Sequence, residues 1–130
     1  MRHYTAEILR NAEIINQLHS RIHEALKYRD KSEHKYKEWQ RACEEFHSRY
    51  DSLAFPGGFE GAFERIIGGD NKAMEAALCF VECRPYFFRS GYMFKDILRK
   101  LKRAPLDVEQ TMRLNQVLEA YARYQSSKNA

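Results

Sequence analysis

Glycine and proline are scarce in this chain and absent from its first part. All six glycines and all three prolines of the 130 residues lie after residue 55. Because both residues interrupt regular structure, their absence favours helix throughout residues 1–55. The chain also contains neither an alternating run of β-branched residues nor an Asn-Gly turn, the usual signals of strands and hairpins. The sequence therefore predicts an all-α protein.

Cysteines and long apolar runs are also few. The three cysteines are Cys43, Cys79 and Cys83, an odd and low number that argues against a disulfide framework. No apolar run reaches the roughly 18 residues of a membrane-spanning helix. The first residues, MRHYTAEILRN, lack the apolar centre of a secretory signal. We therefore expect a cytoplasmic protein with no membrane-spanning segment.

Sequence motifs of catalysis are missing. The chain has no His-Glu-x-x-His and no Gly-x-Ser-x-Gly pattern. The glycine-rich stretch at residues 57–61 is not followed by Lys and Ser or Thr, so it is not a phosphate-binding loop. We expect a protein that acts by binding and has neither catalytic residues nor a cofactor.

Apolar residues recur at spacings of three and four through residues 1–55. Counted as heptads from Ile8, eleven of the fourteen a and d positions are apolar. This period keeps one side of a helix against a partner helix, so we call these positions the seam. Its principal members are Ile8, Ile15, Leu18, Ile22, Tyr36, Trp39, Phe46 and Tyr50.

Two structures explain the seam. One is a continuous helix of about 48 residues. The other is a hairpin that turns within residues 28–32, where the seam is polar, with Asp30 and Glu33 as a capping box for the second helix. We favour the continuous helix because the heptad register is unbroken. Such a helix needs a second copy or another partner to cover its apolar stripe.

Four shorter helices are expected after residues 55–58 (Phe-Pro-Gly-Gly), the clearest break in the chain. Asp70, Ser90 and Asp107 are placed to cap three of them, and short loops favour antiparallel neighbours. We therefore divide the chain into a helical arm (1–55), a small helical module (56–125) and a frayed tail (126–130).

Positive charge is concentrated in one segment. Residues 84–104 hold seven basic side chains and one acidic one, a net +6, whereas the whole chain has +4. This segment begins with four aromatic residues and two arginines within residues 84–92, and further cations follow at helical spacing. The candidate residues for binding an anionic partner are Arg84, Arg89, Tyr92, Lys95, Arg99, Lys102 and Arg103.

Two interpretations of this segment stay open. In the simpler one, the aromatic rings fill the core between two helices and the cations form a solvated face. In the functional one, the cations contact phosphates and an exposed Tyr86 or Tyr92 stacks on an unpaired base. No RNP sequence, GXXG loop or zinc-finger spacing accompanies the segment.

The cysteines suggest a further hypothesis. Cys43 and His47 are four residues apart, as are Cys79 and Cys83, so each pair occupies one helix face. If the two pairs face each other, they complete a tetrahedral structural zinc site. The simpler interpretation is that all three cysteines are buried free thiols and that His47 lies on the solvated edge.

These observations lead to a non-enzymatic helical interaction protein that binds a protein partner or a second copy through the seam. The first alternative is a nucleic-acid-binding protein that uses residues 84–103. The second is a small inhibitor or immunity-type protein whose basic segment covers an acidic protein surface.

Overall fold

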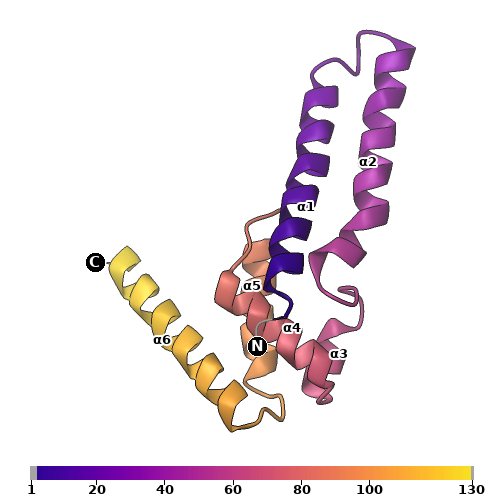
Figure 1. Cartoon of the computed structure of the whole chain (residues 1–130). Helices are drawn as coiled ribbons and strands as arrows, with labels where there is room; N and C mark the ends of the chain where they lie inside the picture. Colours follow the sequence, from indigo (N-terminus) through magenta and orange to yellow (C-terminus); the bar gives the residue numbers. More distant parts are fainter. Residues whose placement is uncertain (1–2, 130) are drawn as a thin grey trace.

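The computed structural model describes residues 3–129, which form six α-helices and no strand (Figure 1). The all-α prediction is confirmed. The helices are α1 (Thr5–Leu26), α2 (Glu33–Ala54), α3 (Ala62–Ile67), α4 (Asn71–Cys83), α5 (Ser90–Leu101) and α6 (Val108–Asn129). None of these helices combines the length and apolar character that crossing a membrane requires.

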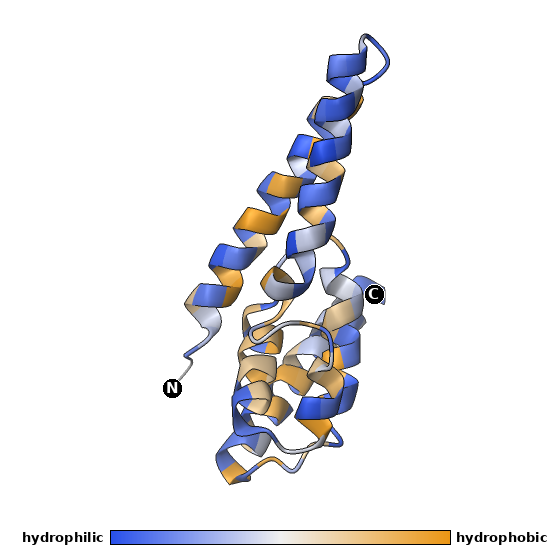
Figure 2. Ribbon diagram, turned by 90° about the vertical axis from the view of Figure 1, so that its right-hand side faces the viewer, coloured by the Kyte–Doolittle hydropathy of each residue, from blue (hydrophilic) through white to orange (hydrophobic). Residues whose placement is uncertain are grey.

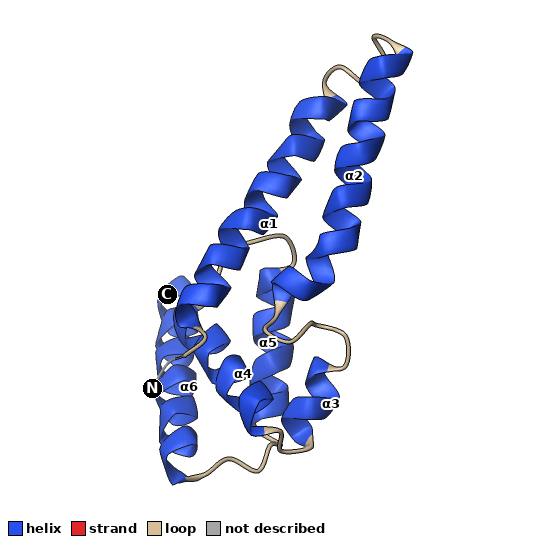
Figure 3. Ribbon diagram, turned by 45° about the vertical axis from the view of Figure 1, so that its right-hand side comes forward, coloured by secondary structure: helices blue, strands red, loops and turns tan. Residues whose placement is uncertain are grey.

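The helices α1 and α2 form a hairpin whose closed end projects away from the other four helices (Figures 1 and 3). The continuous helix that we favoured is therefore wrong, because the chain leaves helical structure after Leu26 and re-enters it at Glu33. The expected capping residue was wrong as well: Ser32, and not Asp30, caps α2, and its side chain accepts a hydrogen bond from the Lys35 N–H at 3.1 Å.

The hydrophobic core lies where the open end of the hairpin meets α4 and α5. One continuous cluster of buried side chains joins the arm to the module. Its members include Ile8, Ile15, Leu18, Phe46, Phe55, Ile66, Leu78, Phe80, Ile97 and Leu101. Figure 2 shows the same division, since the closed end of the hairpin is mostly hydrophilic and hydrophobic residues gather in the body.

Side-chain caps begin two of the later helices as predicted. Asp70 accepts hydrogen bonds from the N–H groups of the first turn of α4. Asp107 and Gln110 form a reciprocal capping box at α6, in which each side chain accepts the other's backbone N–H. Ser90 was expected to cap α5, but it is the first helical residue, and Arg89 occupies the cap position.

The ends of α5 and α6 also differ from expectation. The sequence predicts a helix over residues 91–103, and the corresponding helix α5 ends at Leu101, two residues earlier. The helix α6 continues through residues 126–129, the segment that we expected to fray, and Ala130 lies outside the described residues. The helix α6 packs mainly on α4, through buried Leu114 and the ion pairs of Arg113. Farther along α6, Tyr121 and Tyr124 contact Arg84, and the C-terminal end of the helix lies at the edge of the molecule (Figure 1).

Candidate anion-binding groove

The loop between α4 and α5, residues 84–89, begins and ends in a strained backbone conformation. Arg84 has φ 46° and Arg89 has φ 69°, and they are the only non-glycine residues with positive φ in residues 3–129. This left-handed region costs a side-chain-bearing residue roughly 1–2 kcal/mol. Glycine would remove this strain, so the presence of arginine at both positions points to a role for the two side chains.

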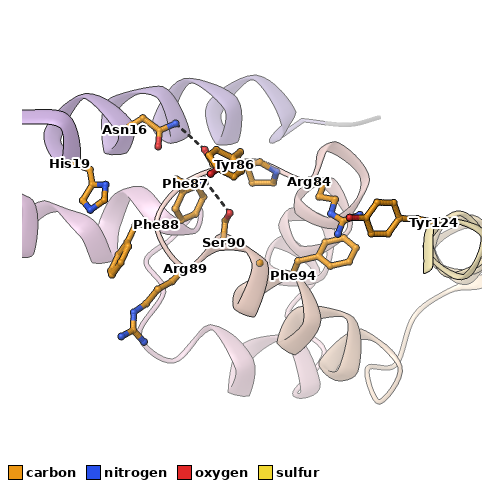
Figure 4. A pocket seen from close by; sticks show the side chains of 12 residues that line it. Asn16, His19, Arg84, Tyr86, Phe87, Phe88, Arg89, Ser90, Phe94 and Tyr124 are labelled. Atoms are coloured by element: carbon orange, nitrogen blue, oxygen red, sulfur yellow. Dashed lines mark hydrogen bonds between the residues drawn. The ribbon is translucent and has the colours of Figure 1, made fainter. Parts of the chain in front are cut away.

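Neighbouring helices hold the loop in place (Figure 4). Asn16 on α1 donates from Nδ2 to the Tyr86 carbonyl at 2.9 Å. The Tyr50 hydroxyl on α2 donates to the Phe88 carbonyl at 2.7 Å. Burial raises the pKa of the Tyr50 hydroxyl, an effect that nearby Arg89 opposes, so this hydroxyl keeps its proton at neutral pH. The hairpin thus fixes the backbone of a loop that carries the candidate binding residues.

The aromatic side chains of this region divide between core and surface. Phe87 is 5% exposed, and its N–H donates to Ser90 Oγ at 3.0 Å. Tyr86 and Tyr92, in contrast, are 87% and 73% exposed. The interpretation that these rings fill the core therefore fits Phe87 and does not fit the two tyrosines.

A hollow of about 700 Å³ opens beside the loop. Its walls come from α1, the loop, α5 and the C-terminal part of α6, as Figure 4 shows. The lining residues are Asn16, His19, Arg84, Pro85, Tyr86, Phe87, Phe88, Arg89, Ser90, Gly91, Phe94 and Tyr124.

Arg84 occupies an aromatic cage formed by α5 and α6. The guanidinium carbon lies 4.4 Å from the ring centre of Phe94, 4.8 Å from that of Tyr124 and 5.5 Å from that of Tyr121. Cation–π contacts of this kind bind the face of the guanidinium and leave its N–H edge free to donate. Arg84 therefore holds α6 against the body while still offering hydrogen-bond donors.

A second hollow, of about 300 Å³, continues from the first between α5 and α6. The two hollows share Arg84 and Tyr124, and together we call them the basic groove. The second hollow is lined by Arg84, Lys95, Tyr121, Tyr124, Gln125, Lys128 and Asn129.

The lining of the basic groove carries positive charge alone. No Asp or Glu lines either hollow in the described part of the chain. Its cations, Arg84, Arg89, Lys95 and Lys128, form no ion pair with any residue in 3–129. The N-terminus of α5 has no acidic residue in its first turn, so its partial positive charge is also uncompensated. The groove is therefore suited to an anion.

The structure brings together only some of the basic residues predicted from sequence. Arg84, Arg89 and Lys95 line the groove, and exposed Tyr92 lies on the first turn of α5. Arg99 forms an ion pair with Asp96 one turn away. Lys102 and Arg103 are exposed beyond the end of α5 and line neither hollow.

The contributions of α1 and α6 to the groove were not predicted from the sequence. Asn16 and His19 come from α1, the helix that carries the first part of the seam. Tyr121, Tyr124 and Lys128 are spaced at i, i+3 and i+7, so one face of α6 carries two rings and a cation. That spacing was visible in the sequence, but it does not reveal which helix the face meets.

The seam packs mainly within this chain. Ile8, Ile15, Leu18 and Phe46 are buried in the common core. The remaining seam members, Ile22, Trp39, Tyr50 and Tyr36, are half-buried or exposed. The hairpin thus covers most of the stripe that a continuous helix would have presented to a partner.

The four residues of the hypothetical zinc site do not assemble. Among residues 3–129, no three His, Cys, Asp or Glu side chains are placed to hold a metal ion. Burial raises the pKa of the Cys83 thiol to about 11, with smaller contributions from Cys79 and Glu82, so Cys83 stays protonated at neutral pH. A protonated thiol is a poor metal ligand. All three cysteines are free thiols, but the expectation that they are buried holds only for Cys79, since Cys43 and Cys83 are half-buried.

No protein-family model matches the chain, and comparisons with curated proteins and with solved structures find no significant match. The argument for function therefore rests on the residues and geometry of the groove.

Proposed function

We propose that this protein acts by binding and not by catalysis, and that the basic groove takes an anionic partner. The observation that carries the proposal is the set of four cations that have no ion-pair partner among residues 3–129, in two joined hollows that no described carboxylate lines. Like charges gathered on one surface repel each other, and an anion relieves that repulsion.

The fixed loop adds a second argument. Binding is weakened when a ligand must first order a mobile segment. Here the carbonyls of Tyr86 and Phe88 are already held by α1 and α2, and Phe87 anchors the loop in the core. Backbone strain such as that at Arg84 and Arg89 tends to occur where a surface is shaped to bind a ligand.

A polyanion column tests the proposal. The purified protein is applied to immobilised heparin and eluted with salt, because contacts between cations and an anionic polymer weaken as salt rises. The double variant Arg89→Glu with Lys95→Glu should elute at clearly lower salt than the unaltered protein. Both side chains are exposed, so the variant should fold, and circular dichroism checks that it does.

The matched control makes the same change of charge elsewhere. Lys31→Glu with Lys37→Glu reverses two exposed cations at the closed end of the hairpin. If the groove binds, this control elutes close to the unaltered protein. Equal losses in both variants would mean that only net charge matters, and failure of the unaltered protein to bind would remove the proposal.

Assembly through the hairpin is a second candidate function, and a specific observation favours it. The closed end exposes three large side chains, Leu26 at 41% and Tyr28 and Tyr36 at 44% each. Exposed rings and aliphatic side chains near one another mark protein contact sites. Light scattering on the unaltered protein and on Leu26→Asp tests it: a mass above the monomer that falls to the monomer in the variant supports assembly, and a monomer in both contradicts self-association.

A further inference from the structure

The exposed tyrosines beside the basic groove narrow the class of its partner. Resting on the proposed function, we infer that the groove binds single-stranded nucleic acid, with the cations on phosphates and Tyr86 and Tyr92 stacked on unpaired bases. Three features favour this partner: the position of the tyrosine rings, their exposure to solvent and the positive charge around them.

Tyr86 and Tyr92 lie on either side of the arginine that ends the loop. Tyr86 lines the first hollow together with Arg84 and Arg89. Tyr92 follows two residues after Ser90, on the first turn of α5, and points out of the core that its neighbours Met93 and Phe94 enter. A stacking ring beside a phosphate-binding cation is the pairing that sequence-tolerant single-strand binders use.

The exposure of Tyr86 is built into the loop. Its carbonyl is held by Asn16, and the next residue, Phe87, is buried, so the backbone directs the Tyr86 side chain outward. A ring of this size with 87% of its surface in water contributes little to stability. Its flat apolar face is available to a base without any rearrangement of the loop.

Tyr124 extends the same pattern along the groove. It lies in both hollows, its ring is nearly parallel to that of Tyr121 with an interplanar angle of 16°, and Lys128 lies one helical turn beyond it. The second hollow therefore gathers two rings, Tyr121 and Tyr124, with the cations Arg84, Lys95 and Lys128. Rings and cations on one surface suit the bases and phosphates of a flexible strand.

Other anionic partners would use only part of this surface. A duplex keeps its bases stacked inside, so it would contact the cations and leave the tyrosine rings unused. An acidic peptide would likewise meet the arginines and lysines, but its carboxylates have no extended flat face to stack. The exposed rings favour a single strand over both.

Fluorescence anisotropy with labelled oligonucleotides tests the inference. The probes are thymidine and uridine oligonucleotides of about 12 nucleotides, within the length that one such site covers, and an abasic strand of the same length. Tyr86→Ala and Tyr92→Ala should each weaken binding of the thymidine strand about tenfold, the usual effect of losing one stacked base. The abasic strand should bind the unaltered protein more weakly than the thymidine strand does and should be insensitive to both substitutions.

Met112→Ala is the matched control, because it removes an exposed large apolar side chain of α6 that lines neither hollow. It should leave affinity unchanged. Equal affinity for the abasic and thymidine strands would overturn the inference, as would full affinity in both groove variants. Tight binding of the duplex or of polyglutamate in preference to a single strand would also overturn it.

The two proposals fail separately. In one outcome, heparin binding requires Arg89 and Lys95, but the affinity for oligonucleotides is the same with and without bases. The groove then binds an anion, and the inference about single strands is wrong. If the Arg89→Glu, Lys95→Glu variant binds heparin and every strand as tightly as the unaltered protein, the proposed function fails and takes the inference with it.

Discussion

Arg113 on α6 donates from Nη2 to Glu82 Oε1 on α4 at 2.6 Å, and the two side chains are only 11% and 13% exposed. The same guanidinium donates from Nη1 to Glu75 at 2.7 Å, two helical turns before Glu82 on α4. The hydrogen bonds to Glu82 and the one to Glu75 raise the pKa of Arg113 against the opposing effect of burial, so it stays charged. This enclosed cluster is the main polar attachment of α6.

Replacing Arg113 should destabilise the protein strongly. Arg113→Met keeps the length of the side chain but leaves Glu75 and Glu82 enclosed without this cation, and breaking a buried ion pair typically costs about 3–5 kcal/mol. The free energy of unfolding from urea titration measures the effect. Arg123→Met, at an exposed position of the same helix, should change stability little. Similar values for the two variants would show that the cluster does not hold α6.

Arg89→Gly should separate stability from binding. Glycine adopts the left-handed backbone at this position without strain, so the variant should gain roughly 1 kcal/mol of stability. It should at the same time elute earlier from heparin, because the groove loses a cation. Arg89→Ala is the control: it should lose the same binding without the gain in stability. If Arg89→Gly is less stable than the unaltered protein, contacts of the arginine side chain contribute more to stability than the backbone strain costs.

Stability should fall in mildly acidic solution through His19. Burial, with a smaller effect of His23, lowers the pKa of His19 in the folded protein. The unfolded chain, with the ordinary value of about 6.5, then takes up this proton more readily than the folded chain does. The contribution is therefore fully present above that value and is lost as the pH falls through the folded-state pKa of His19.

Urea titrations at about pH 7.5 and pH 5 measure this effect, since the two values lie on either side of the ordinary histidine pKa. The drop in stability between them should be smaller in His19→Gln than in the unaltered protein. An equal drop in the two proteins would assign the pH dependence to other groups.

Two of the three cysteines should resist thiol reagents in the folded protein. Cys79 is fully buried, and burial raises the pKa of Cys83 to about 11, which leaves almost no reactive thiolate at pH 8. Only half-buried Cys43 is expected to be labelled promptly by an aromatic disulfide reagent. All three should react once the protein is unfolded in urea. Rapid labelling that survives Cys43→Ser would contradict the burial of Cys79 or the raised pKa of half-buried Cys83.

Helix content was predictable here because local signals agree. Most of the run without glycine or proline is helical, as Thr5–Leu26 and Glu33–Ala54. The caps at Asp70 and at Asp107 with Gln110 form as their spacing indicates. The hairpin was harder, because a heptad stripe looks the same on one long helix and on two antiparallel ones. No residue of 27–32 needs positive φ, so the turn requires no glycine, and the absence of glycine carried no information about it.

Only the part of the groove formed by the loop and the start of α5 could be predicted from the sequence. Arg84, Arg89 and Lys95 stood out because charge and aromatic residues are dense there. Tyr124 and Lys128 enter the groove because α6 returns across α4, which is a property of packing between distant segments. No local pattern encodes that return.

The helix α6 carries both Arg113 and part of the groove, so the docking of α6 on α4 and the binding of a ligand are linked thermodynamically. The groove is complete only while Tyr124 and Lys128 are docked, so any ligand that contacts them stabilises the docked position of α6. By reciprocity, a change that loosens the docking of α6 must lower the affinity of the groove for the ligand by the same factor. Arg113, which lines neither hollow, therefore influences the affinity of the groove for its ligand from a distance. Glu75 and Glu82 on α4 do so as well, because they hold Arg113, although neither contacts the anion.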